Sequence, residues 1–443
     1  MKFPQLTDVA EIRAYGEAVR GSSTMSDLDN AIADPRTYGD EARIHALLKD
    51  LRDNDPVHWA EPEGFRPYWA ITKYADILEI EKLNDKFLNE PRSTLMNIQT
   101  EHDLAAMWGG PDPKTGRVSP FRTLIDMDNP DHRAYRGLTQ AWFMPANLKK
   151  LEARTTELAK RYVDLMMEKG PECDFAREIA VYYPLHVIMS ILGVPESDEP
   201  LMLKLTQELF GGTDPDMKRK EDAATNTSTI MDFFIYFNKM SAERRANPGE
   251  DLATVIANGK VNGCPLGDLE TASYYIIVAT AGHDTTSATI AGGLRALAEN
   301  PDQLAKLKAN PDLLGSAVDE MFRWSTPVQH FMRTATEDYP LRGKTIKKGD
   351  ALQLLYLSGN RDEEVFADPF KFKIDRENNR HVAFGYGAHV CIGQHLAKME
   401  IKAFFKELIG RLQTIELTGE PKRIQSTFVS GLKALPVRYT LAA

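Results

Sequence analysis

Cysteine is scarce in this chain. Its 443 residues include only three, Cys173, Cys264 and Cys391. They are too few and too scattered for a secreted disulfide framework or for a zinc site built from paired cysteines. The sequence therefore indicates a reducing compartment.

An excess of positive charge is also missing. The chain has 54 Lys and Arg residues against 64 Asp and Glu residues, a net charge of −10. This balance argues against a general nucleic-acid surface or a surface for anionic membranes. A local basic patch remains compatible with it, but no nucleic acid and no membrane are expected as partners.

Long, uninterrupted apolar runs are absent as well. The first residues, MKFPQLTDVAEIRAYGEAV, lack a basic segment followed by an apolar core, so neither a signal peptide nor a membrane anchor is expected. We expect a cytoplasmic protein. The most apolar later stretch, YYIIVATAGHDTTSATIAGG, carries His283 and Asp284 in its middle. That polarity indicates a helix buried inside a protein rather than a membrane span.

Helical spacing dominates the chain, without repeats, low-complexity tracts or long linkers, which favours one continuous domain over residues 1–443. The fold class expected is mainly α with small β-sheets. Three helices are expected to hold the functional residues: Pro265 to about Glu299, Asp312 to Trp324, and the segment GQHLAKMEIKAFFKELIGRL that follows Cys391. Short β-like runs lie at Pro67–Tyr74, around Arg333–Leu357 and at Phe428–Leu441.

The strongest functional signal is the loop FGYGAHVCIG, Phe384 to Gly393, which leads directly into a helix. Peptide N–H groups and the helix dipole at a helix start stabilise a thiolate. Glycines let the backbone approach a flat ligand closely. The alternative is a buried cysteine without a ligand, which packs as a small hydrophobe. The neighbouring glycines, Phe384 and His389 favour the liganded cysteine.

The pattern Phe-Gly-x-Gly-x-His-x-Cys-x-Gly resembles the haem-ligand loop of the cytochrome P450 superfamily and matches it at every position. The resemblance covers essentially the whole chain. It implies the single-domain P450 fold, a triangular helical prism around a buried haem b. It also implies that Cys391 is the axial thiolate ligand of the iron, with Phe384 beside the sulfur and Gly393 in the same loop.

Within that resemblance, Ala281-Gly282-His283-Asp284-Thr285-Thr286 supplies the oxygen-activating residues. Gly282 would leave room for oxygen. Asp284 and Thr285 can deliver and relay protons, which requires groups within hydrogen-bond reach or one water away. The alternative is that Thr285 bonds to its own backbone and that Asp284 is merely solvated. His283 receives no catalytic role.

Two further sets of residues follow from the family. Glu320 and Arg323, three apart on one helix face, match its structural Glu-x-x-Arg pair, with Ala367–Arg376 as the partner segment. Taken alone, such a spacing is typical of a surface ion pair. Haem propionates need several charge-assisted hydrogen bonds, and the residues at family positions are His132, Arg136, Arg333 and His389. A solvated surface cation is the alternative for each.

The segment Cys173 to Gly212 resembles more narrowly the bacterial P450 enzymes that hydroxylate the monoterpenoid alcohol terpineol. The resemblance is weaker through Asn89–Pro120, the loop expected to cover the substrate. By family position, the substrate pocket is expected to be lined by mainly apolar residues: Thr123, Leu124, Leu209, Phe210, Ile277, Thr280, Ala281, Val328, Phe331, Phe428 and Val429. Such a lining selects compact or flat hydrocarbons by shape. Ordinary core packing is the alternative for each residue.

The resemblance implies a haem-thiolate monooxygenase that uses O2 to hydroxylate a small apolar substrate, a terpenoid or an aromatic or alkyl hydrocarbon. The chain has neither a Rossmann-type glycine fingerprint nor a ferredoxin-like cysteine cluster, so electrons are expected from a separate ferredoxin and its reductase. The expected docking face lies near Arg133, Arg136 and Lys398. Two alternatives remain: a peroxide-driven oxygenase, which the intact Asp284-Thr285 pair disfavours, and a haem-based gas or ligand sensor.

Overall fold

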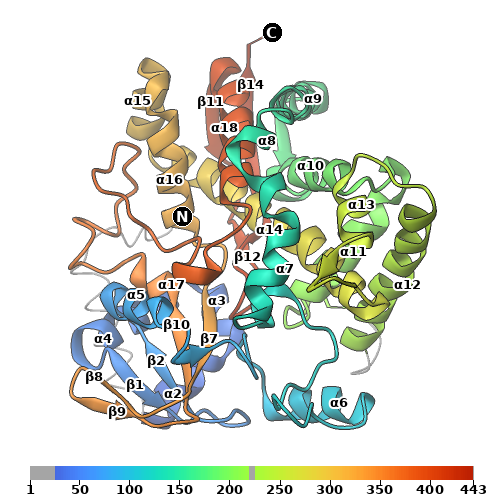
Figure 1. The fold of residues 1–443 in the computed structure, drawn as a ribbon. Coiled ribbons are helices and arrows are strands. Elements are labelled where there is room, and N and C mark those ends of the chain that lie inside the picture. The colour runs from blue at the N-terminus through green and yellow to red at the C-terminus, as the bar shows by residue number, and fades with distance from the viewer. Residues whose placement is uncertain (1–24, 219–224, 443) are drawn as a thin grey trace.

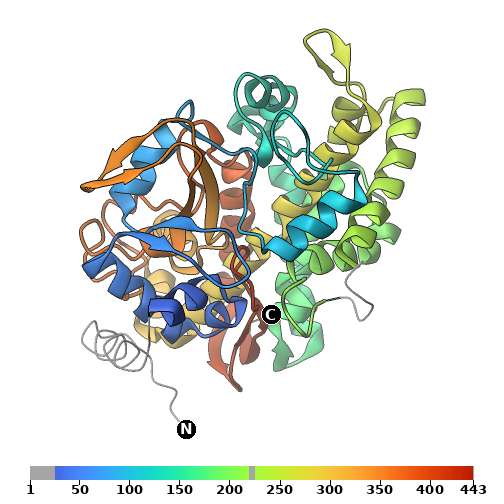
Figure 2. The same ribbon diagram turned by 90° about the horizontal axis from the view of Figure 1, so that it is seen from below.

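The long helix α14 (Asp268–Glu299) runs through the middle of the computed structural model, which describes residues 25–218 and 225–442. On one side lie the main β-sheet and the first helices, α2 to α5; on the other lie α9 to α13 (Figure 1). The view from below shows the same division (Figure 2). α14 therefore borders both parts of the molecule.

The other helices, in chain order, are α2 (Met25–Ala33), α3 (Pro35–Gly39), α4 (Glu41–Asn54), α5 (Tyr74–Lys82), α6 (Ile98–Met107), α7 (Asp131–Thr139), α8 (Pro145–Leu148), α9 (Glu152–Lys169), α10 (Tyr182–Leu192), α11 (Glu199–Phe210), α12 (Thr225–Ala246), α13 (Leu252–Ala257), α15 (Pro301–Ala309), α16 (Leu314–Ser325), α17 (Tyr356–Gly359) and α18 (Gln394–Arg411). A π-helical turn, η3 (Ala176–Ala180), precedes α10. Among the residues just described, no helix is both long enough and apolar enough to cross a bilayer.

The largest sheet has the strand order β1-β2-β10-β7-β3, in which only the β2–β10 pair is parallel. Its strands are β1 (Val57–Ala60), β2 (Tyr68–Ile71), β3 (Phe87–Leu88), β7 (His330–Ala335) and β10 (Ala351–Leu355). The smaller sheets contain β4 (Glu172–Asp174), β5 (Lys260–Val261), β6 (Cys264–Pro265), β8 (Tyr339–Leu341), β9 (Lys344–Ile346), β11 (Leu412–Leu417), β12 (Lys422–Arg423), β13 (Leu432–Ala434) and β14 (Pro436–Leu441). The expected mainly α fold with small sheets is confirmed.

Each of the three expected helices is present, with small shifts at its ends. α14 starts at Asp268 rather than at Pro265, because Pro265 pairs with Lys260 in the β5–β6 hairpin. Glu270 accepts a hydrogen bond from the N–H of Gly267 at 2.7 Å, and the helix ends before Asn300-Pro301. At 1.5 Å per residue its 32 residues span about 48 Å.

The middle of α14 is buried although it carries many hydroxyl groups. Thr271, Ser273, Thr280 and Thr289 each donate to the carbonyl oxygen four residues earlier, at 2.7 to 2.9 Å. These bonds satisfy buried hydroxyls inside the helix itself. Polar side chains on α14 that do not bond in this way therefore need another explanation.

Candidate active site

The loop before Cys391 is folded tightly onto the end of α5. Gly385 and Gly387 have φ angles of +67° and +70°, in the left-handed region that glycine tolerates. A Cβ at Gly387 would lie 2.5 Å from the carbonyl oxygen of Glu81, so no other residue fits there. The N–H of Cys391 donates to the carbonyl oxygen of Phe384 at 2.9 Å, which closes the loop.

The sulfur of Cys391 lies at the start of α18 and lines an internal cavity. Burial raises the pKa of the thiol, while the peptide N–H groups of Gly393 and Gln394 and the guanidinium of Arg136 act in the opposite direction. These groups stabilise negative charge on the sulfur. A cationic metal in the cavity would complete the stabilisation of a thiolate.

The Cys391 cavity extends from this sulfur to α14, and most of its lining is apolar. It is lined by Leu124, Ile125, His132, Arg136, Thr139, Phe143, Ile188, Ile277, Val278, Ala281, Gly282, Thr285, Thr286, Phe322, Pro327, Val328, Phe331, Tyr356, Ala383, Phe384, Gly385, His389, Cys391, Ile392, Gly393, Leu396, Ala397 and Glu400. Of the residues expected at the substrate, Leu124, Ile277, Ala281, Val328 and Phe331 are among them.

The other residues expected at the substrate lie elsewhere. Phe210 and Val429 line a second cavity, which α11, α14 and the segment 424–433 bound on the other side of Asp284. Thr123 bonds to Asp126 at the start of a short 3-10 turn, and Thr280 is 1% exposed with its hydroxyl bonded to Ile276. Phe428 packs against Phe331 at a ring-centroid distance of 5.4 Å, behind the lining. The sequence missed Ile125 and Val278, whose only signal is apolar character beside expected residues.

Two histidines and an arginine lie together in the Cys391 cavity. His132 on α7 stacks on His389 with ring centroids 3.8 Å apart. Burial, and to a smaller extent the nearby arginines, lowers the pKa of His132 to about 4. Burial, and to a smaller extent His132 and the same arginines, lowers the pKa of His389 to about 2. Arg136 donates to the carbonyl oxygen of Val390 at 2.8 Å. The rim thus offers N–H donors suited to carboxylates.

Arg333, expected at the same rim, does not line the cavity. Its Nη2 donates to Glu81 at 2.9 Å and its Nη1 to the carbonyl oxygen of Met332. Glu81 is buried, and Tyr356 also donates to it. Burial raises the pKa of Glu81, against the influence of Arg333 and Tyr356. The structure therefore gives Arg333 a carboxylate partner that the sequence did not indicate.

Asp284 and Thr285 face different sides of α14. Thr285 lines the Cys391 cavity, and its hydroxyl donates to the carbonyl oxygen of Ala281 at 2.9 Å, which leaves its lone pairs free to accept. Asp284 lines the second cavity instead. His283 is fully buried and contacts the carbonyl oxygen of Val181 at 2.7 Å, a structural contact between α14 and the residue before α10.

Gly282 has a packing role that differs from the sequence interpretation. A Cβ at this position would lie 2.7 Å from Cγ1 of Ile188 on α10. The missing side chain therefore makes room for α10, not for oxygen, although the backbone of Gly282 borders the Cys391 cavity.

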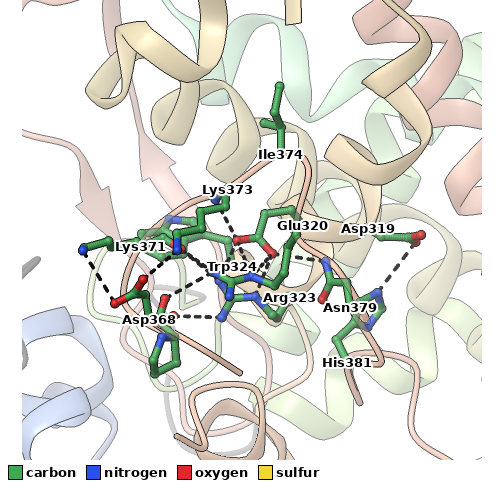
Figure 3. Close-up of polar contacts among 12 residues, drawn as sticks. Asp319, Glu320, Arg323, Trp324, Asp368, Lys371, Lys373, Ile374, Asn379 and His381 are labelled. Carbon is green, nitrogen blue, oxygen red and sulfur yellow. Dashed lines mark hydrogen bonds and ion pairs between the residues drawn. The ribbon is translucent and has the colours of Figure 1, made fainter. Parts of the chain in front are cut away.

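Glu320 and Arg323 on α16 are both fully buried and bond through two contacts of 2.7 Å. Figure 3 shows the segment around Lys371–Ile374 wrapped around this pair. Arg376 donates to both Glu320 oxygens, and Arg323 donates to the carbonyl oxygens of Asn360 and Pro369. Burial alone would raise the pKa of Glu320, but the two arginines lower it. The pair is thus a buried cluster and not a surface ion pair.

Glu400 on α18 is a cavity residue that the sequence analysis missed. It is 1% exposed, its Oε2 has no hydrogen-bond partner among the described residues, and burial raises its pKa well above the usual range. Its only sequence signal is a carboxylate among Leu396, Ile401 and Phe404 on the buried face of α18.

Comparison with known proteins supports what this geometry indicates. The family model "Cytochrome P450" matches residues 187–441. Cytochrome P450-terp from a Pseudomonas species is 44% identical over 416 residues, covering 92% of this chain and 96% of that protein. This chain belongs to the cytochrome P450 family. A steroid C26-monooxygenase of Mycolicibacterium smegmatis is 34% identical, covering 89% and 90%. The crystal structure of CYP108D1 from Novosphingobium aromaticivorans matches with a TM-score of 0.86 at 42% identity, covering 94% and 99%.

The protein is therefore a cytochrome P450 monooxygenase with the P450 fold, and its cofactor is haem b. The residues present fit that group. A thiol that accepts peptide hydrogen bonds, an apolar cavity beside it and three nitrogen-bearing side chains at the rim correspond to an iron ligand, a macrocycle site and propionate partners.

Proposed function

We propose that this P450 hydroxylates a small apolar molecule, a terpenoid or an aromatic or alkyl hydrocarbon, with O2 and with electrons from a ferredoxin. The observation that carries the proposal is the largely apolar lining between Cys391 and Thr285. The relative named Cytochrome P450-terp supports a terpenoid, as does the solved CYP268A2 of Mycobacterium marinum in complex with pseudoionone, at 31% identity and a TM-score of 0.83. We also propose that residues 1–443 form one domain.

The reaction consumes one O2, two electrons and two protons for each substrate, and yields an alcohol and one water. Bound haem supplies the oxygen chemistry, with Cys391 as its thiolate ligand. His132, Arg136 and His389 would hold its carboxylates through N–H groups, and Arg333 would join them if it exchanged Glu81 for a propionate. Phe384 and Gly393, the first and last residues of the ligand loop, line the same cavity as Cys391.

The chain's own residues would position the substrate and move protons. Leu124, Ile277, Ala281, Val328 and Phe331 exclude water and select the substrate by shape. The Thr285 hydroxyl donates its hydrogen to the carbonyl oxygen of Ala281, so its lone pairs would accept a hydrogen bond from a water on the substrate side. Asp284 holds the proton that is passed on, at its carboxylate oxygens.

Ferredoxin would dock where α7 and the Cys391 loop reach the surface. Arg133 is exposed, Arg136 bonds to the carbonyl of Val390 next to Cys391, and Lys398 lies 5.4 Å from the centroid of the Phe384 ring. Cations there would attract an acidic partner to the face nearest the iron ligand.

The test of substrate class is a titration of the ferric enzyme with monoterpenoids, alkylbenzenes, fused aromatics, steroids and fatty acids. A Soret shift on binding, followed by product analysis with ferredoxin, reductase and NADH, should single out terpenoids or similarly compact hydrocarbons. Turnover with added peroxide alone would instead establish the peroxide-driven alternative. Binding without turnover under either condition would favour the sensor.

A further inference from the structure

Glu81, near the end of α5, is a buried carboxylate that connects three other segments of the chain. Its Oε1 accepts hydrogen bonds from Nη2 of Arg333 on β7, at 2.9 Å, and from the hydroxyl of Tyr356 on α17. Its Oε2 accepts one from the N–H of Tyr386 in the Cys391 loop. Glu81 is only 3% exposed. This carboxylate therefore lies directly against the loop that carries the iron ligand.

The contacts of Glu81 indicate that it is ionised. A neutral carboxyl group carries a hydrogen that needs an acceptor, whereas a carboxylate only accepts. Arg333 and the N–H of Tyr386 can only donate, and they bind different oxygens of Glu81. Burial raises the pKa of Glu81, but these donors and the Tyr356 hydroxyl act in the opposite direction. Both oxygens thus face donors, as suits a negative charge.

The charges around the haem site leave that of Glu81 without a balancing cation. Among the described residues that line the Cys391 cavity, Arg136 is the one arginine or lysine. The two stacked histidines at its rim are uncharged at neutral pH, because their pKa values are about 4 and 2. Arg136 and Arg333 would balance the two propionates of haem b. Arg333 carries a single positive charge, so when a propionate takes it, Glu81 remains as an additional anion.

We propose that Glu81 is a positioning residue that sets the reduction potential of the haem: it holds Arg333 and the Cys391 loop, and its negative charge lowers that potential. The inference rests on the proposed haem contacts of Cys391 and Arg333. Reduction of ferric haem adds one electron, so the centre gains one negative charge. A buried anion nearby opposes this gain more strongly than it would in water.

The reduction potential of the substrate-free enzyme tests the proposal. Glu81→Gln removes the charge and keeps an oxygen that can accept a hydrogen bond. Its potential should rise, with the ferrous form favoured roughly tenfold more than in the parent, which is about 59 mV for one electron. Glu79→Gln, which removes an exposed carboxylate from the same helix, should leave the potential unchanged. A parental potential in Glu81→Gln, at parental haem content, would overturn the proposal.

Tyr356→Phe separates an effect of charge from a loosening of the Cys391 loop. This variant removes one donor from Glu81 and leaves its negative charge, so the charge is less well compensated and the potential should fall. A loosened loop would not move the two variants in opposite directions. A potential that stays or rises in Tyr356→Phe would therefore contradict the proposal, and this holds even if Glu81→Gln fails to bind haem.

The haem site itself is tested separately. If Cys391→Ser keeps the strongly red-shifted Soret band of the reduced carbon monoxide complex, the haem site is wrong and the inference fails with it. If Cys391→Ser loses the band while Glu81→Gln keeps the parental potential, only the role of Glu81 is wrong. The proposed substrate chemistry then stands, because the potential is measured without substrate.

Discussion

At the scale of single residues, the environment of Cys391 combines burial with peptide N–H groups aimed at its sulfur. Cys391→Ser should therefore abolish the strongly red-shifted Soret band of the reduced carbon monoxide complex, because a serine hydroxyl does not ligate iron as a thiolate does. The absorption spectrum of the reduced variant with carbon monoxide shows whether the band is lost. A variant that also lacks Cys173 and Cys264 but still shows this band would disprove the assignment.

Thr285 offers a residue-scale prediction about coupling. Its hydroxyl keeps one hydrogen bond to Ala281 and can still accept another in the Cys391 cavity. Thr285→Ala should bind substrate and consume NADH and O2, but release a large share of the electrons as hydrogen peroxide. Product and peroxide formed per NADH oxidised measure this, with Thr285→Ser as the control that retains a hydroxyl. An alanine variant that couples like the parent would favour a structural role for Thr285.

At the scale of elements, α10 and α14 meet where Gly282 leaves room for Ile188. Gly282→Ala should destabilise the protein by about 1–3 kcal/mol through overpacking. Ile188→Ala should cost about 2–5 kcal/mol by itself, and the double variant should be more stable than the sum of the two changes predicts. Urea unfolding of all four proteins measures the coupling. Additive effects would mean that the two positions are independent.

The cluster around Glu320 links α16 to the segment 367–376. Arg323→Ala should cost about 3–5 kcal/mol at neutral pH, because it leaves a buried carboxylate without its main partner. The folded-state pKa of Glu320 is lowered, so its stabilising contribution is present above the unfolded pKa of about 4.3 and is lost as pH falls further.

The difference in unfolding free energy between parent and Arg323→Ala should accordingly shrink in acid. Lys306→Ala, which breaks an ion pair whose side chains are both 43% exposed, should cost less than about 1 kcal/mol and serves as the control. Equal losses of unfolding free energy in Arg323→Ala and Lys306→Ala would show that burial of the Glu320 cluster does not affect its contribution to stability.

Local sequence patterns predicted the elements well, and long-range packing explains most of what they missed. The Cys391 loop, α14 and the Glu320–Arg323 spacing each lie within one short segment, so motif and periodicity were sufficient. The placement of Phe210 and Val429 in the second cavity depends on contacts such as that of Asp214 with Lys433 and with the N–H of Gln425. No pattern within either segment indicates that pairing, which forms only in the folded chain.

At the scale of the whole molecule, the cations of the proposed ferredoxin face stand out against a net charge of −10. Arg133→Glu should keep the haem content but slow the first electron transfer and reduce its dependence on salt, since surface charges act mainly on association rates. Stopped-flow reduction at several ionic strengths measures both effects. Arg43→Glu, an exposed position on α4 in the sheet-containing part, is the matched control. Equal rates for the two variants would argue against this docking face.

The strand order of the main sheet also constrains how the protein is made. Trp69 on β2 pairs with Leu352 on β10, which lies 283 positions later in the chain. At a synthesis rate of about 5–20 residues per second, roughly 15–55 s pass between the synthesis of β2 and that of β10. During that time one edge of the nascent β1–β2 hairpin has unpaired peptide groups, which are templates for pairing with other chains. We therefore expect the yield of folded protein in a host cell to depend on how well chaperones shield this hairpin until β10 has been synthesised.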